Sequence, residues 1–86
     1  MQVTIYGRDN CPYCVRAKAL ALRLKENVAG FNFEYIDMIA KGLTKEDLAD
    51  IIKKPVETVP QVIIDGQSIG GFTDFDAYVK ANIGDY

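Results

Sequence analysis

Two cysteines lie three positions apart, in the order Cys11-Pro12-Tyr13-Cys14, and the chain has no other cysteine. A disulfide between them would close a loop too short to restrain much of the unfolded chain, so a structural bridge is not expected. Thiolates are nucleophiles, and two cysteines at this spacing can carry out thiol–disulfide exchange. The pair therefore indicates redox chemistry.

The residue types around the pair predict different roles for the two sulfurs. Pro12 suits the first position of a helix, because its missing N–H would be unpaired there anyway, and Cys11 becomes the N-cap. The unpaired N–H groups and positive dipole end of the helix stabilise a thiolate at Cys11, with Arg8 and Lys18 adding positive charge. Cys14 lies inside the first turn and is expected to be less exposed, with an ordinary pKa. We therefore expect Cys11 to attack and Cys14 to resolve.

Other uses of a cysteine pair fit this chain poorly. Zinc takes four ligands, and the sequence offers two sulfurs and no histidine. Covalent haem attachment needs a histidine directly after Cys14, where the chain has Val15. Two buried cysteines without any function remain an alternative, which Pro12 at a helix start makes less attractive. No metal site is predicted.

Apolar periodicity predicts the elements that position the pair. Residues 2–6 alternate as a short strand that ends at Gly7, and the helix after the cysteines has one apolar stripe, made of Ala17, Leu20, Ala21, Leu24 and Val28. A second strand alternates apolar residues from 31 to 35. Thr44 then opens a second helix, which carries Leu48, Ile51 and Ile52.

The last third of the chain predicts a hairpin and a final helix. Asp65-Gly66 suits the two-residue type I′ turn between strands at 62–64 and 67–69. The third helix carries Phe75, Tyr78, Val79 and Ile83. The order β-α-β-α-β-β-α predicts an α/β fold of the thioredoxin-like type: one domain, residues 1–86, with a four-stranded mixed sheet flanked by three helices.

Composition excludes several classes of protein. The chain is 49% hydrophobic and 26% charged, with apolar runs of only a few residues, so neither disorder nor a membrane span is expected. No signal peptide is recognisable, which predicts a cytoplasmic protein. Residues 1–25 hold five basic residues and one acidic residue, and residues 26–86 hold five basic and eleven acidic residues. With a pI near 4.9, nucleic-acid binding is not expected.

Three motifs in this order resemble the dithiol glutaredoxin family, and its bacterial members most. They are the tetrapeptide at 11–14, Thr58-Val59-Pro60, and the run Gly70-Gly71-Phe72-Thr73-Asp74. The resemblance extends along essentially the whole chain. It implies a glutathione-disulfide oxidoreductase with catalytic Cys11 and Cys14, no bound cofactor, and glutathione as co-substrate.

The resemblance also implies a glutathione site. In it the backbone of Val59, before a cis Pro60, pairs with the cysteine part of glutathione, while Gly71 and Phe72 lie close to the ligand. The helix start at Thr73 binds the γ-glutamyl carboxylate, and Asp74 pairs with the ammonium group. The candidates for the glycine end are Arg8, Tyr13 and Thr58.

The partners implied are glutathione and proteins that carry a disulfide or a bound glutathione, of which ribonucleotide reductase is the type that the family suggests. A monomer is expected. Two alternatives stay open at this point: a module that holds a [2Fe-2S] cluster with glutathione, and a redox-inactive thioredoxin-like interaction domain.

Overall fold

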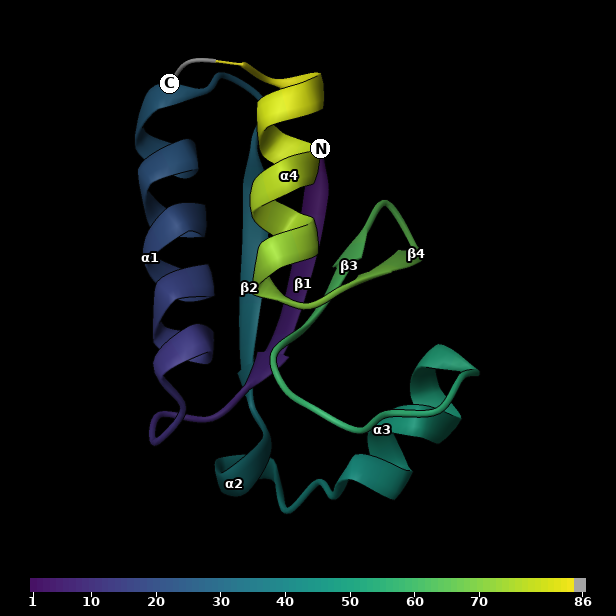
Figure 1. Cartoon of the computed structure of the whole chain (residues 1–86). Helices are drawn as coiled ribbons and strands as arrows, with labels where there is room; N and C mark the ends of the chain where they lie inside the picture. The colour runs from purple at the N-terminus through teal and green to yellow at the C-terminus, as the bar shows by residue number, and fades with distance from the viewer. Residues whose placement is uncertain (85–86) are drawn as a thin grey trace.

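The computed structural model describes residues 1–84, so the last two residues of the predicted domain lie outside it. The sheet has the order β2-β1-β3-β4 (Figure 1). Strand β1 (Gln2–Gly7) runs parallel to β2 (Asn32–Asp37) and antiparallel to β3 (Gln61–Ile64), and β4 (Gln67–Gly70) runs antiparallel to β3. The predicted mixed sheet and thioredoxin-like fold class are confirmed.

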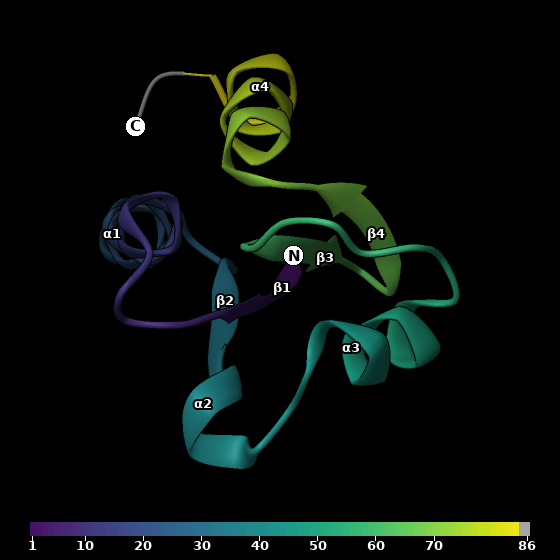
Figure 2. The same ribbon diagram turned by 60° about the horizontal axis from the view of Figure 1, so that its bottom comes forward.

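The described helices are α1 (Pro12–Asn27), α2 (Met38–Lys41), α3 (Lys45–Ile52) and α4 (Phe72–Asn82). Figure 2 shows α1 and α4 on one side of the sheet and α2 and α3 on the other. Helix α2 was not predicted, because four residues are too few to show an apolar period. Its cap is visible in the structure: the carboxylate of Asp37 accepts the N–H groups of Ile39 and Ala40 at 3.0 and 3.2 Å. Within residues 1–84, no helix has the length and apolar character needed to cross a membrane.

The core lies between the sheet and the pair α1 and α4. Ile5 of β1, Leu24 of α1 and Phe75 of α4 are fully buried there. Each side chain of this size contributes about 1.5–3 kcal/mol through burial. The predicted apolar stripe of α1 is confirmed, since the core also holds Ala17, Leu20 and Ala21.

Local signals set the ends of several elements as predicted. Thr44 caps α3 through a reciprocal pair of hydrogen bonds with Asp47, at 2.9 and 3.1 Å. Asp65 and Gly66 have φ values of 48° and 85°, which the type I′ turn requires. On α3, Leu48 is buried, but Ile51 is 48% exposed. Ile51 is three residues from Leu48, on the same side of α3, and it lines a hollow between α3 and the sheet rather than a closely packed core.

Candidate active site

Cys11 is the N-cap of α1, directly after the loop that leaves β1. Its Sγ accepts the N–H of Cys14 at 3.3 Å and donates to the carbonyl oxygen of Val59 at 3.5 Å. The residue is partly exposed. The N-cap position predicted for Cys11 is thus confirmed, and its sulfur lies where a helix end meets solvent.

Cys14, one turn further on, is fully buried. Burial raises the pKa of its thiol to about 12, and a hydrogen bond with Cys11 adds to the rise, while the backbone and charge of Arg8 oppose it. The expectation of an ordinary pKa for Cys14 is therefore wrong. The reason is desolvation, which disfavours the thiolate.

A hollow of about 360 Å³ lies next to Cys11, since the thiol of Cys11 donates to the carbonyl oxygen of Val59, one of its lining residues. The segment before β3 passes close to the starts of α1 and α4 here (Figure 1). All three sequence motifs contribute to its lining: one residue of the tetrapeptide at 11–14, the whole of Thr58-Val59-Pro60, and four residues of the run at 70–74. The lining residues are Tyr13, Thr58, Val59, Pro60, Gly71, Phe72, Thr73 and Asp74. Each of them is a residue that the resemblance assigns to glutathione.

The segment before β3 forms one wall of this hollow. The peptide bond between Val59 and Pro60 is cis, as the resemblance implies. The side chain of Gln61, which is only 8% exposed, donates to the carbonyl oxygen of Thr58 at 2.8 Å. This bond ties the segment to the start of β3 beneath it.

An aromatic pair forms the opposite wall. The rings of Tyr13 and Phe72 have centroids 6.3 Å apart and are tilted by 34°. The guanidinium of Arg16 lies 5.2 Å from the centre of the Tyr13 ring, within the range of a cation–π contact. These contacts hold Tyr13, which is 54% exposed, at the mouth of the hollow.

The start of α4 closes the hollow. The carboxylate of Asp74 accepts the N–H of Gly71 at 3.2 Å. Gly70 has a φ of 115°, and a Cβ built there would overlap this carboxylate, so glycine is required at that position. The N–H groups of Phe72 and Thr73, in the first turn, have no intrahelical acceptor and can bind an anion.

Arg8 stands apart from the other predicted binding residues. It is not among the residues that line the hollow; its carbonyl oxygen accepts the N–H of Cys11 at 3.3 Å. Lys18 has its ammonium 4.8 Å from the centre of the Tyr35 ring. The position of Tyr35 near the cysteines was not predicted from the sequence. The sequence signal at Tyr35 is the alternation of apolar residues in β2, which does not show which residues of other elements Tyr35 contacts.

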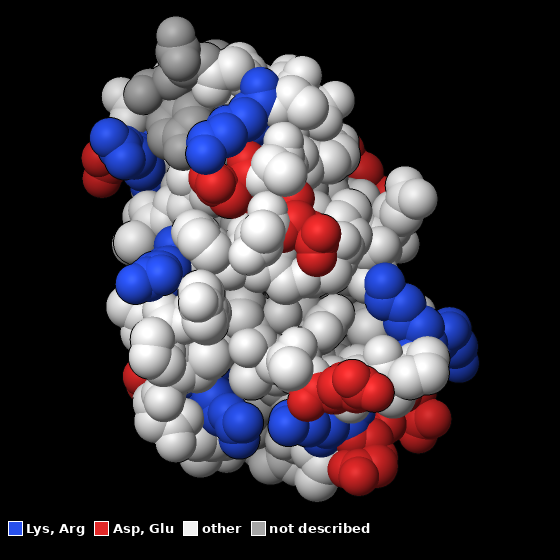
Figure 3. All heavy atoms as spheres, viewed as in Figure 1, with Lys and Arg blue, Asp and Glu red and all other residues white. Residues whose placement is uncertain are grey.

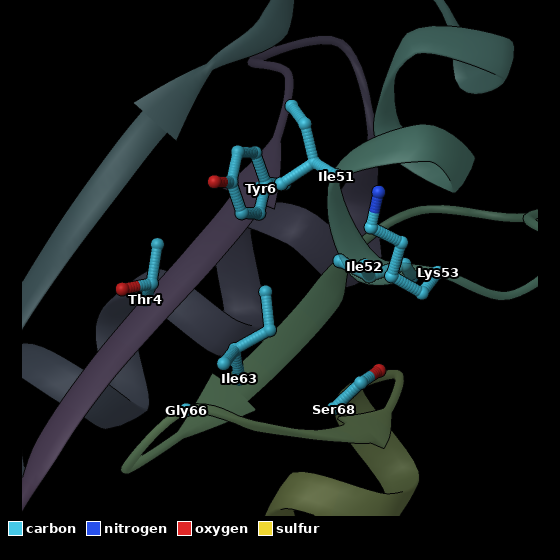
Figure 4. Close-up of a pocket in the computed structure, with 8 residues that line it drawn as sticks. All are labelled: Thr4, Tyr6, Ile51, Ile52, Lys53, Ile63, Gly66 and Ser68. Atoms are coloured by element: carbon cyan, nitrogen blue, oxygen red, sulfur yellow. The ribbon is translucent and has the colours of Figure 1, made fainter.

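A second hollow, of about 290 Å³, lies on the other face of the sheet, between α3 and strands β1, β3 and β4 (Figure 4). Tyr6 and Ile51 face each other across it. Ser68 Oγ is buried there and has no hydrogen-bond partner among the described residues. None of the predicted site residues lines this hollow. Over α3, acidic and basic side chains lie next to one another (Figure 3).

The family model described as Glutaredoxin matches residues 3–69. The chain is also 57% identical to a glutaredoxin of Haemophilus influenzae over 84 residues, which are 98% of this chain and 97% of that protein. It belongs to the glutaredoxin family. Its resemblance to dithiol glutaredoxins, inferred from three short motifs, is confirmed.

Solved glutaredoxins have the same fold. The reduced glutaredoxin of Escherichia coli matches with a TM-score of 0.87 and 54% identity, covering 99% of this chain and all of the other. A buckwheat glutaredoxin in complex with glutathione matches with a TM-score of 0.67 and 25% identity, covering 95% of this chain and 69% of that one. This glutaredoxin is accordingly a glutathione-dependent thiol–disulfide oxidoreductase, its cysteine pair matches a dithiol active site, and glutathione is its substrate.

Proposed function

We propose that Cys11 is the attacking nucleophile and Cys14 the resolving thiol, in one domain formed by residues 1–86. The contrast between a sulfur at an open helix end and a fully buried one supports this division. The Cys11 thiolate attacks a disulfide, forms a mixed disulfide and releases the other half as a thiolate. Either glutathione then frees Cys11, or Cys14 displaces the bound protein and leaves a Cys11–Cys14 disulfide, which two glutathione molecules reduce.

The hollow beside Cys11 binds the glutathione part of the substrate. The observation that carries this proposal is that eight residues from three separate segments line one hollow next to the attacking sulfur. The backbone of Val59 pairs with the cysteine part, as in strand addition. The N–H groups at the start of α4 bind the γ-glutamyl carboxylate, and Asp74 binds its ammonium group. That the buckwheat relative forms a complex with glutathione supports glutathione as the ligand of this hollow.

The glycine end of glutathione lies toward Tyr13 and Thr58, with Arg8 adding positive charge from the side of the cysteines. The protein substrates are glutathionylated proteins and proteins with an accessible disulfide, of the ribonucleotide reductase type that the family suggests. The protein acts on them as a monomer in the cytoplasm.

Asp74→Asn tests the binding site, because the amide oxygen can still accept the N–H of Gly71 while the charge is lost. We expect the KM for a glutathionylated peptide to rise about tenfold or more, since a hydrogen bond to a charged group contributes roughly 1.5–3 kcal/mol. Asp76→Asn removes one charge from the same helix and should leave KM near the parent value. The rate at which iodoacetamide alkylates Cys11 should not change in either variant. If alkylation and KM both deteriorate in Asp74→Asn, Asp74 has a structural role only.

A further inference from the structure

Gly7 is the last residue of β1, and the space that a side chain would take there is occupied by the Cys14 thiol and the Tyr35 hydroxyl. A Cβ built at Gly7 would stand 2.9 Å from Cys14 Sγ and 2.8 Å from the hydroxyl oxygen of Tyr35. Both distances are shorter than real Cβ contacts. The absence of a side chain at Gly7 therefore lets a thiol from α1 and a phenol from β2 lie next to each other.

Strand register places Tyr35 beneath α1. Tyr35 pairs with Ile5 in the parallel ladder of β1 and β2, so it lies on the same sheet face as that fully buried residue. From above, the ammonium of Lys18 lies 4.8 Å from the centre of its ring. The ring is thus held between β2 and α1, with its hydroxyl beside the buried cysteine.

The Tyr35 hydroxyl is protonated at neutral pH and can donate a hydrogen bond there. Burial, followed by the nearby charge of Cys14, raises its pKa to about 12. The other titratable and charged groups that face this thiol–phenol pair are Cys11, Arg8, Asp9, Lys18 and Asp37. A neutral phenol in this setting can donate a hydrogen bond to a neighbouring anion.

The resolving step needs such a donor. In the mixed disulfide, Cys11 Sγ is bonded to the substrate sulfur and is no longer a thiolate. The thiol of Cys14 therefore loses Cys11 as an anionic hydrogen-bond acceptor. Cys14 must then lose its proton in a buried place, where desolvation disfavours the anion. The hydroxyl of Tyr35 is one such donor, because its oxygen and Cys14 Sγ both lie within 3 Å of the position that a Cβ of Gly7 would take.

We infer that Tyr35 is a positioning residue for the resolving step, in which its hydroxyl donates a hydrogen bond to Cys14 Sγ as the thiolate forms. The Cys14–Cys11 bond forms, the bond from Cys11 to the substrate sulfur breaks, and the substrate leaves as a thiolate. The proton of Cys14 goes to solvent, and the leaving thiolate takes one up. This inference rests on the proposed roles of Cys11 and Cys14.

The test uses a peptide held on Cys11 as a mixed disulfide, with release of the peptide thiol followed in a single turnover without glutathione. Tyr35→Phe removes only the hydroxyl and keeps the ring under Lys18, and it should slow release about tenfold, the effect of losing a hydrogen bond to a charged group. Tyr6→Phe makes the same change on the other face of the sheet and should have the parent rate.

A second readout separates positioning from a general structural effect. Reduction of a glutathionylated peptide by glutathione is measured in a Cys14→Ser background, with and without Tyr35→Phe. Equal rates are expected, because Cys14 is absent; a comparable loss in this background would make Tyr35 structural and overturn the inference. If Cys14→Ser alone releases the peptide from Cys11 at the parent rate, the proposed function fails. If it blocks release but Tyr35→Phe does not slow release, only the role of Tyr35 fails.

Discussion

The two faces of the sheet are packed differently. Val3 and Ile5 point from β1 into the fully buried core under α1 and α4. Their neighbours Thr4 and Tyr6 point to the other face and are only partly buried. There a hollow remains between the sheet and α3, and Ile51 is about half exposed beside it.

All of the proposed chemistry lies on the closely packed side. Cys14 is buried in it, and Cys11 stands at its edge, so both sulfurs are fixed by a helix that the core holds in place. Thiol–disulfide exchange needs three sulfurs to meet in a defined geometry, and rigid elements position such groups better than loosely held ones. The difference between the faces teaches that close packing and reactivity occur together in this protein. Changes on the two faces should therefore have unequal effects.

The largest effect is expected at the edge of the packed face. Cys11→Ser should abolish all turnover, because a serine hydroxyl is not ionised at neutral pH and forms no mixed disulfide. Cys14→Ser should keep most of the activity toward a glutathionylated peptide, yet trap a protein substrate as a mixed disulfide, visible on a non-reducing gel. Equal loss of peptide activity in both variants would contradict the division of labour between the two cysteines.

Next in size is Gly7→Ala, which puts a methyl group against Cys14 and Tyr35. Overpacking of this kind costs about 1–3 kcal/mol, which should appear in the free energy of unfolding in urea. Gly71→Ala is the matched control, because its Cβ would lie 3.5 Å from the carbonyl oxygen of Pro60, an ordinary contact. If Gly7→Ala lowers the free energy of unfolding no more than Gly71→Ala does, the packed face accommodates the added methyl group without strain.

The buried thiol should also make stability depend on pH. The pKa of Cys14 is raised to about 12 in the folded protein, against about 8.5 for an unfolded thiol. The unfolded chain therefore loses this proton first, and stability should fall as pH rises above about 8.5, by at most about 1.4 kcal/mol per pH unit. Urea unfolding of the reduced protein at a series of pH values measures this. Cys14→Ala should show a shallower fall; identical slopes would mean that Cys14 ionises as readily when folded.

The smallest effect is expected on the open face. Ile51→Ala removes a half-exposed side chain and should change the free energy of unfolding by about 0.5 kcal/mol or less, with turnover unchanged. Leu48→Ala, three residues earlier on α3 and fully buried, should cost about 2–5 kcal/mol. A loss of turnover in Ile51→Ala would mean that the open face takes part in the reaction.

Much of the fold followed from the sequence because its signals are local. Pro12 makes Cys11 an N-cap, Thr44 caps α3, and Asp65-Gly66 forms the hairpin turn. Each of these depends on backbone preferences and hydrogen bonds within a few residues. The glutathione-binding candidates came instead from resemblance to a family, since neither spacing nor periodicity connects the tetrapeptide at 11–14 with the segments at 58–60 and 71–74.

Only the tertiary structure could show how those segments meet. Burial of Cys14, and with it the high pKa of its thiol, results from the packing of α1 on the sheet and cannot be obtained from a position in the first helical turn. The meeting of Tyr35 with Cys14 depends on the register between β1 and β2 and on the gap at Gly7. Caps and turns depend on residues that are neighbours in the chain, so the sequence by itself determined them. Desolvation and close approach depend on atoms far apart in the chain, so only the tertiary structure decided them.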